Sequence, residues 1–213
     1  MQPAEKVVPE SLGRRRSTQR RRWDSTDLSL ISVFAALIAA LAILPGIPVG
    51  PLGVPITLQT LGVLLAGVVL GPTRGTAAVL LYLVAGLIGL PVFSGFSGGF
   101  GVLAGPSAGY LVAFPFAAFV AGLFAVFVLR RFHRARVLFL FLACMMASLL
   151  TIHPLGIGGL MVNAGLPLRE AIIVDSAYLP GDVVKNILAA ILAASVHRAF
   201  PRLLSPRRPA LRD

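Results

Sequence analysis

The chain has 213 residues, of which 57% are hydrophobic and only 13% are charged, and its formal net charge is +11. A soluble domain carries about 25% charged residues, so this composition excludes an ordinary soluble protein. Residues 28–73 and 75–129 contain no Asp, Glu, Lys, Arg or His. Uncharged runs of this length predict several membrane crossings within one domain.

The excess of positive charge has a simple explanation in such a chain. The arginines form short clusters between the apolar runs or outside them, for example Arg14-Arg15-Arg16 and Arg20-Arg21-Arg22. Cytoplasmic loops of membrane proteins are enriched in Lys and Arg, so the clusters indicate topology and argue against nucleic-acid binding. Cys144 is the single cysteine, which excludes an internal disulfide.

Residues 1–27 are polar and basic and show no apolar period, so we expect a disordered cytoplasmic tail. Residues 28–44 predict the first transmembrane helix. Small side chains repeat along it with four-residue spacing, and a face of small residues lets two helices approach closely in lipid. The two faces are Ala35 with Ala39, and Ala36 with Ala40.

A proline-rich, uncharged loop over residues 45–55 precedes a second helix at about 56–70, whose first turn carries Thr57, Gln59 and Thr60. At ~1.5 Å per residue this helix is ~22 Å long, shorter than the ~30 Å hydrocarbon core. A short span next to an irregular loop predicts backbone that lines a cavity. Gly71 and Pro72 predict a tight turn, in which Arg74 is interpreted as a topology signal.

The third helix, at about residues 76–90, contains Tyr82 and leads into a long Gly-rich loop. The loop carries Phe93, Phe96 and Phe100, has no charge, and ends near Tyr110. A loop in water would normally carry charge, so we expect this one to fold back over the protein.

The second half of the chain predicts three further spans. We expect helices at about 107–129, at 137–153 with its end at Pro154, and at 180–198. A Gly-rich loop at 156–169, a short interfacial helix at 170–178 and a basic cytoplasmic tail at 199–213 complete the prediction. Placing the arginine clusters on the inside gives an all-α bundle of six transmembrane helices over residues 28–198, with both termini cytoplasmic.

A carboxylate and an ammonium enter the last predicted span at Asp182 and Lys185. At i, i+3 they share one face of a helix. Ionisable side chains are expensive in lipid, so such a pair usually faces the bundle interior and marks a polar ligand, ion or proton path. The alternative is a capping role, in which Asp182 offsets the positive helix N-terminus and Lys185 is its surface partner.

Several kinds of chemistry find no support. The sequence has no G-x-x-x-x-G-K-[ST] phosphate-binding loop and no Cys/His cluster for a metal, so we predict no cofactor and no metal. Gly95-Phe96-Ser97-Gly98 fits the G-x-S-G of rhomboid-type intramembrane serine proteases, with His153 as a possible base. Four residues are a weak signal in a chain with 22 glycines, and we expect no enzyme activity.

The chain resembles the BioY family, the biotin-binding subunits of energy-coupling-factor transporters. The resemblance spans about residues 29–197 and rests on ordered blocks. These are Pro55-Ile56-Thr57-Leu58-Gln59-Thr60, Leu70-Gly71-Pro72-Thr73-Arg74-Gly75, Tyr82-Leu83, Gly86-Leu87-Ile88-Gly89-Leu90-Pro91-Val92-Phe93, Gly105-Pro106-Ser107-Ala108-Gly109-Tyr110-Leu111 and Pro180-Gly181-Asp182-Val183-Val184-Lys185. Ser107 and Ala108 stand where the family pattern has threonine and glycine.

The resemblance implies a multi-pass protein of the cell membrane that captures extracellular biotin. It implies three partners, a transmembrane coupling protein and two ABC ATPases, with the alanine faces of the first helix docking the coupling protein. Asp182 and Lys185 would hold polar groups of the vitamin. The residues expected to help them are Thr57, Gln59, Tyr82, Phe93, Phe96 and Tyr110. A stand-alone facilitator that needs no ATPase remains an alternative.

Overall fold

The computed structural model describes residues 23–49, 54–132, 134–201 and 203–204. The elements in chain order are α1 (Ser25–Ile43), β1 (Ile47–Val49), β2 (Val54–Ile56), α2 (Gln59–Leu87), the 3₁₀ turns η1 (Ser94–Phe96) and η2 (Phe100–Ala104), α3 (Ala108–Arg131), α4 (Arg136–Ala147), the π-helical segment η3 (Ser148–Ile152), α5 (His153–Asn163), α6 (Leu168–Ser176) and α7 (Leu179–Ala199).

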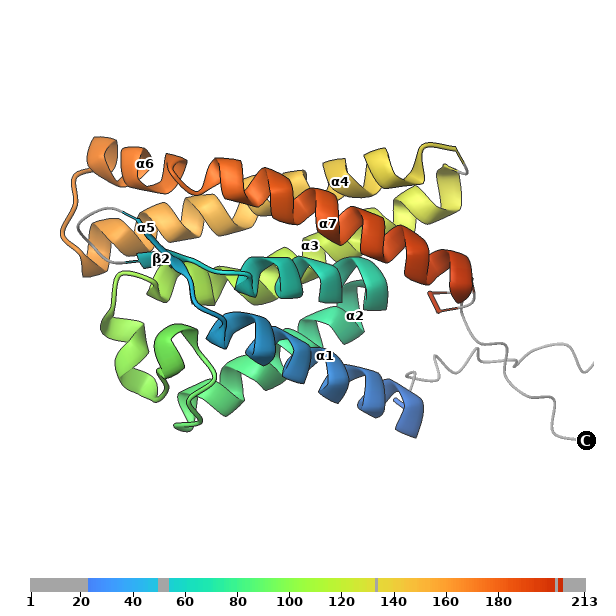
Figure 1. Cartoon of the computed structure of the whole chain (residues 1–213), viewed down its shortest axis with the longest axis horizontal. Coiled ribbons are helices and arrows are strands. Elements are labelled where there is room, and N and C mark those ends of the chain that lie inside the picture. Colours follow the sequence, from blue (N-terminus) through green and yellow to red (C-terminus); the bar gives the residue numbers. More distant parts are fainter. Residues whose placement is uncertain (1–22, 50–53, 133, 202, 205–213) are drawn as a thin grey trace, which may run out of the picture.

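The long helices form one bundle (Figure 1). Among the described residues, five stretches are long and apolar enough to cross a membrane: α1, α2, α3, the continuous run Arg136–Asn163, and α7. The predicted all-α membrane bundle is confirmed to this extent, whereas the count of six spans stays a prediction. The start of α1 and the end of α7 lie at the same end of the bundle, and the β1–β2 hairpin and α6 lie at the other.

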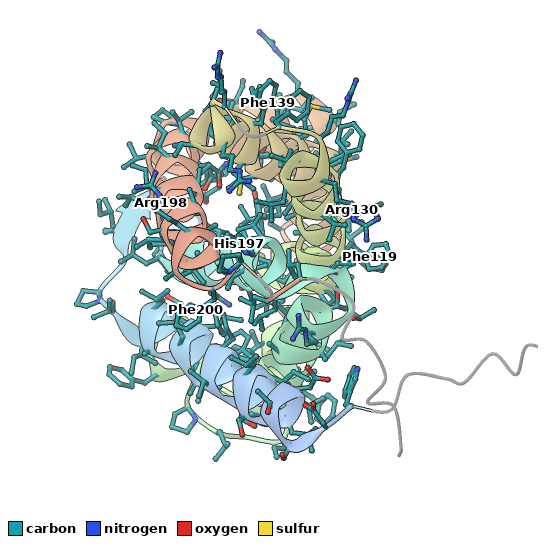
Figure 2. All side chains as sticks on the ribbon, turned by 90° about the vertical axis from the view of Figure 1, so that its right-hand side faces the viewer. Phe119, Arg130, Phe139, His197, Arg198 and Phe200 are labelled. Carbon is teal, nitrogen blue, oxygen red and sulfur yellow. The ribbon has the colours of Figure 1, made fainter. Side chains whose placement is uncertain are left out.

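Figure 2 looks onto the end that carries the arginines. Arg130 and Arg198 lie at the rim of the bundle and His197 lies toward its interior. This grouping agrees with the charge pattern that predicted the topology, although the side of the membrane on which this end lies stays a prediction. The predicted basic tails, 1–27 and 199–213, fall mostly outside the described residues.

The start of α1 is fixed by a capping box. The Asp24 carboxylate accepts a hydrogen bond from the backbone N–H of Asp27 at 2.8 Å, and the Asp27 carboxylate accepts one from the backbone N–H of Asp24. Such reciprocal bonds satisfy two N–H groups that the first turn leaves free. The helix therefore begins at Ser25, slightly before the predicted start at residue 28.

α2 is broken in its middle by the predicted Gly71–Pro72 turn. Gly71 has φ +81°, a left-handed conformation that glycine adopts without strain, and Pro72 suits the first position of the arm that follows. The two arms then lie against each other, because a Cβ on Gly75 would come within 2.6 Å of the Ala66 carbonyl oxygen. The turn was predictable because both residues signal it locally.

Arg74, next to this turn, is buried and does more than mark topology. Its guanidinium forms an ion pair with Asp27 of α1 at 3.1 Å and donates hydrogen bonds to the carbonyls of Leu70 and Leu203. Three segments distant in sequence therefore meet at one cation.

The predicted helix end at Pro154 and the predicted loop over residues 156–169 are wrong. α4 runs through the π-helical segment Ser148–Ile152 directly into α5, which ends at Asn163. The N–H of His153 bonds the carbonyl of Ser148, five residues earlier. This wider turn places Pro154 at the start of α5, where its missing N–H costs little. The short helix predicted near residues 170–178 is confirmed as α6.

The described parts of the uncharged loops at the far end contain regular structure. The proline-rich stretch contains an antiparallel hairpin, in which Ile47 pairs with Ile56, and the sequence reading missed these strands. The Gly/Phe loop folds back over the protein as expected. Its carbonyls of Leu103 and Gly105 accept hydrogen bonds from the Asn163 side chain at the end of α5, each at 2.9 Å.

α3 and α5 cross where two glycines meet, and this contact yields a prediction. A Cβ on Gly159 would lie 2.6 Å from Gly109, whereas one on Gly158 meets nothing within 4 Å. We expect Gly159→Ala to lower the melting temperature of the purified protein, since overpacking costs about 1–3 kcal/mol. Gly158→Ala should leave it unchanged or raise it, because alanine favours helices. Equal melting temperatures for the two variants would refute the close crossing.

Candidate functional site

A cavity of about 450 Å³ opens at the end of the bundle that carries the hairpin and the Gly/Phe loop. Ligand pockets typically measure about 300–1,000 Å³ and are mostly apolar. Its walls come from β2, the start of α2, the loop, the start of α3 and the start of α7. The lining residues are Val54, Pro55, Ile56, Thr57, Gln59, Thr60, Phe93, Ser94, Gly95, Ser97, Val102, Pro106, Ser107, Tyr110, Leu111, Phe114, Ile152, Tyr178, Asp182 and Lys185.

Asp182 and Lys185 form a buried ion pair on the wall of this cavity. Lys185 Nζ lies 2.5 Å from Asp182 Oδ1, and each side chain is 7% exposed. The ammonium also donates to Thr60 Oγ1 at 2.7 Å and to the Thr57 carbonyl at 3.3 Å. An ammonium has three N–H donors, so these partners occupy all of them. The aspartate, with two oxygens, keeps capacity to accept further bonds.

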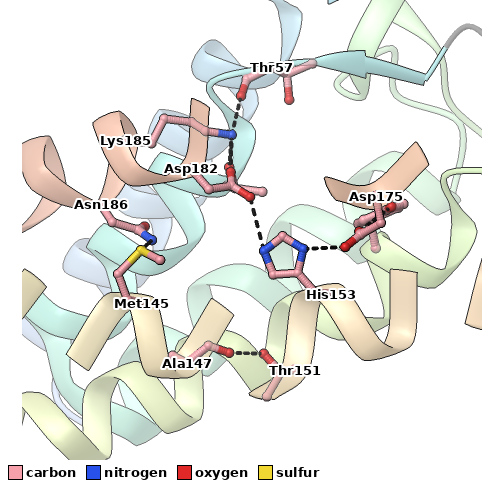
Figure 3. A network of polar contacts seen from close by, with 11 residues as sticks. Thr57, Met145, Ala147, Thr151, His153, Asp175, Asp182, Lys185 and Asn186 are labelled. Carbon is pink, nitrogen blue, oxygen red and sulfur yellow. Dashed lines mark hydrogen bonds and ion pairs between the residues drawn. The ribbon is translucent and has the colours of Figure 1, made fainter. Parts of the chain in front are cut away.

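His153 connects this pair to α6 (Figure 3). Its Nδ1 lies 2.7 Å from Asp175 Oδ2, in hydrogen-bond geometry. On the other side, Nε2 lies 3.4 Å from Asp182 Oδ2, within ion-pair range but outside hydrogen-bond geometry. The imidazole therefore separates two buried carboxylates that would otherwise repel each other.

Two tyrosines tie the same network to the cavity wall. The Tyr110 hydroxyl donates to Asp175 Oδ1 at 2.8 Å, and the Tyr178 hydroxyl donates to the Val54 carbonyl at 3.1 Å. The two rings meet edge to face with their centroids 5.8 Å apart. Burial, and secondly the nearby Asp175 carboxylate, raise the pKa of Tyr178 to about 12, so this hydroxyl stays a donor at neutral pH.

On the opposite wall, Gln59 is held from behind by Tyr82. The Gln59 amide donates to the Tyr82 hydroxyl at 2.7 Å, and that hydroxyl donates to the Val92 carbonyl at 3.2 Å. Tyr82 also packs edge to face with Phe93, with ring centroids 5.4 Å apart. The amide oxygen of Gln59 has no hydrogen-bond partner among the described residues and remains available as an acceptor.

The structure brings most of the predicted ligand residues to one cavity and leaves two outside it. Asp182, Lys185, Thr57, Gln59, Phe93 and Tyr110 line the cavity. Tyr82 is 1% exposed and lies behind Gln59, while Phe96 is 66% exposed and does not line the cavity. Their roles in binding remain predictions, and Tyr82 could act through the hydrogen bond that it accepts from Gln59.

The arrangement does not form a serine-protease site. The Ser97 hydroxyl donates to the Ser94 carbonyl at 2.8 Å, and His153 directs its Nδ1 to Asp175. No hydrogen bond joins Ser97 to His153 in the part of the chain that the structure describes. A general base needs hydrogen-bond reach to its nucleophile.

Comparison with known proteins identifies the family of this chain. The model of the BioY family matches residues 15–202 of the chain. The chain belongs to the BioY family. Membership of a transporter family agrees with the expectation that the chain is not an enzyme.

Two relatives of this BioY chain match along nearly their whole length. It is 43% identical to the biotin transporter BioY of Rhizobium etli over 83% of this chain and 96% of that relative. It is 41% identical to the biotin transporter BioY of Rhodobacter capsulatus over 85% and 98%. The crystal structure of the S-component for biotin from an ECF-type ABC transporter superimposes with TM-score 0.74 at 31% identity, covering 81% of this chain and 91% of that one.

Reasoning from the sequence missed two members of this BioY site, Asp175 and Tyr178, and left His153 with only a weak protease or core role. Asp175 falls in a short amphipathic helix, where an acidic residue is usually solvated. One feature of the sequence could have indicated them, namely the three ionisable residues His153, Asp175 and Asp182 near the predicted outer end. Ionisable residues at membrane depth need partners, and in the structure these three are partners of one another.

The alanine faces of α1 are not equivalent in this BioY structure. Ala35 is buried at 7% exposure and Ala39 packs against the core, whereas Ala36 and Ala40 are exposed. α1 uses its first face to pack within its own chain. Only the Ala36–Ala40 face is open to another protein.

Proposed function

We propose that this chain is the biotin-capturing subunit of an energy-coupling-factor transporter, a multi-pass protein of the cell membrane that binds extracellular biotin and delivers it inward. The observation that carries the proposal is the buried Asp182–Lys185 pair on the wall of a mostly apolar cavity of about 450 Å³. A charged pair in a membrane bundle is expensive and marks a polar ligand.

The cavity offers what the chemistry of biotin requires. Biotin has two ureido N–H donors, a ureido carbonyl, an apolar thiophane ring and a carboxylate on a flexible chain. Asp182 has free acceptor capacity for the ureido N–H groups, and a bond from N–H to a carboxylate is stronger than a neutral one. Phe93, Phe114 and Leu111 supply apolar surface for the ring.

For Lys185 we propose a role that differs from the one suggested by the sequence. Because its three donors already bind Asp182, Thr60 and Thr57, we propose that it neutralises and orients Asp182 and does not itself hold the vitamin. A buried carboxylate without a partner would be costly. The lysine thus lowers the free-energy cost of burying the Asp182 carboxylate at this depth.

Energy for uptake comes from partners, since the sequence lacks an ATP-binding loop. We propose that the Ala36–Ala40 face of α1 docks the transmembrane coupling protein, which works with two ABC ATPases. Small residues on an exposed face allow close helix packing in lipid. Ala40→Leu should leave biotin binding intact and stop uptake by the assembled transporter, measured with labelled biotin in cells. Normal uptake would remove this face from the docking site.

The proposed ligand is tested by mass spectrometry of small molecules released from the purified chain. We expect biotin to be recovered when cells are grown with it, in an amount close to that of the protein. Co-purification of an ATPase pair would separate the transporter subunit from a stand-alone facilitator. A preparation that retains another small molecule and does not bind added biotin would contradict the proposal.

A further inference from the structure

We infer that this site recognises the bicyclic head of its ligand and does not require the charge of the carboxylate. The inference rests on the proposed function and extends it to a substrate class: derivatives whose carboxylate is neutralised as an amide or ester are ligands too. The charges, the hydrogen-bond donors and the cations outside the cavity each support it.

The charges on the cavity wall cancel. Asp182 and Lys185 are the charged residues among those that line it, and they are paired with each other at 2.5 Å. The loop between the hairpin strands, residues 50–53, lies outside the described residues but has the uncharged sequence Gly50-Pro51-Leu52-Gly53. The cavity therefore offers a carboxylate no net positive charge.

Lys185 has no donor left for a ligand carboxylate. Its three N–H groups are committed to Asp182, Thr60 and the Thr57 carbonyl. Turning toward a second carboxylate would weaken the 2.5 Å contact between Lys185 and Asp182 and would leave two negative groups sharing one ammonium. A buried carboxylate with an incomplete partner set is unfavourable, so the existing pair is retained.

The cations nearest in sequence to the site do not replace it. Arg169, at the start of α6, is exposed and does not line the cavity. His153 is held between Asp175 and Asp182 and does not line it either. In the described part of the chain, no unpaired cation reaches the cavity wall.

The donors that remain are neutral: side-chain hydroxyls and the second N–H of the Gln59 amide. The hydroxyls of Ser97, Tyr110 and Tyr178 already donate to protein oxygens. The hydroxyls of Ser94 and Ser107 also line the cavity and have no hydrogen-bond partner among the described residues. A hydroxyl can donate to the carbonyl of an amide or ester and to an oxygen of a carboxylate, and the bond to the carboxylate is the stronger of the two. On this wall the charged form of the side chain therefore gains the extra strength of hydrogen bonds from neutral donors but no ion pair.

The test is calorimetric titration of the purified full chain with biotin, biotinamide and biotin methyl ester. We expect the three dissociation constants to agree within about tenfold, a difference of about 1.4 kcal/mol. Tight binding of biotin with a more than tenfold loss for both neutral derivatives overturns the inference and leaves the proposed function standing. Failure of all three ligands to bind overturns the proposed function.

A pair of variants locates any charge contact that the titration reveals. If Lys185 or Arg169 met the carboxylate, then Lys185→Met or Arg169→Gln would weaken biotin and spare biotinamide. We expect Arg169→Gln to change neither affinity and Lys185→Met to change both by the same factor, so that the biotin-to-biotinamide ratio stays within about threefold of that of the unmodified chain. A ratio that shifts by more than about tenfold in either variant overturns the inference.

Discussion

Asp182→Asn is expected to lower the affinity for biotin by at least tenfold, corresponding to about 1.4 kcal/mol or more. The amide keeps the shape of the side chain but loses the charge that strengthens a hydrogen bond from a ureido N–H. Hydrogen bonds to charged groups contribute about 1.5–3 kcal/mol, which predicts a loss between ten- and a hundredfold. Titration calorimetry on the purified variant measures it.

Two further variants separate binding from folding. Glu170→Gln is the matched control, because it makes the same chemical change at an exposed carboxylate on α6 that does not line the cavity. The double variant Asp182→Asn with Lys185→Met removes both charges, so it should recover stability lost in either single variant but still bind biotin poorly. Unchanged affinity in Asp182→Asn would remove Asp182 from the site.

His153→Phe is expected to produce the largest loss of stability. The substitution keeps a ring in place but takes away the imidazole that contacts both Asp175 and Asp182. Breaking a buried ionic network by removing one partner typically costs about 3–5 kcal/mol. Thermal unfolding of the purified protein should show a lower melting temperature.

His197 provides the control for this prediction. It is buried to the same extent as His153, 5% exposed in each case, but its Nε2 makes a single hydrogen bond, to the Val68 carbonyl at 2.9 Å. His197→Phe should therefore cost only about 1 kcal/mol. Equal falls in melting temperature for the two variants would show that the carboxylates do not depend on His153.

Much of the fold could be predicted because its signals are local. Charge-free runs gave α1 and α3, the apolar run that follows Lys185 gave α7, and the Gly71–Pro72 pair gave the turn within α2. The continuation of the helix past Pro154 was not predictable, because a π-helical turn absorbs the proline and leaves no simple sequence pattern. The short hairpin strands, three residues each, were hidden by their prolines.

The site was predictable only in part, for a related reason. Asp182 and Lys185 are neighbours on one helix, so their pairing could be inferred from spacing alone. The partners that define their roles lie far away in sequence: Thr60 reaches Lys185 from α2, and His153 joins Asp175 across the loop between α5 and α6. Such contacts depend on how the helices pack, which spacing does not encode.

The most direct test is the structure of this chain with biotin bound. We expect the bicyclic head inside the cavity with a ureido nitrogen within about 3.2 Å of an Asp182 carboxylate oxygen, a normal hydrogen-bond distance, and with the Lys185–Asp182 pair intact. Biotin bound elsewhere, or seated in the cavity with its ureido group turned away from Asp182, would contradict the account.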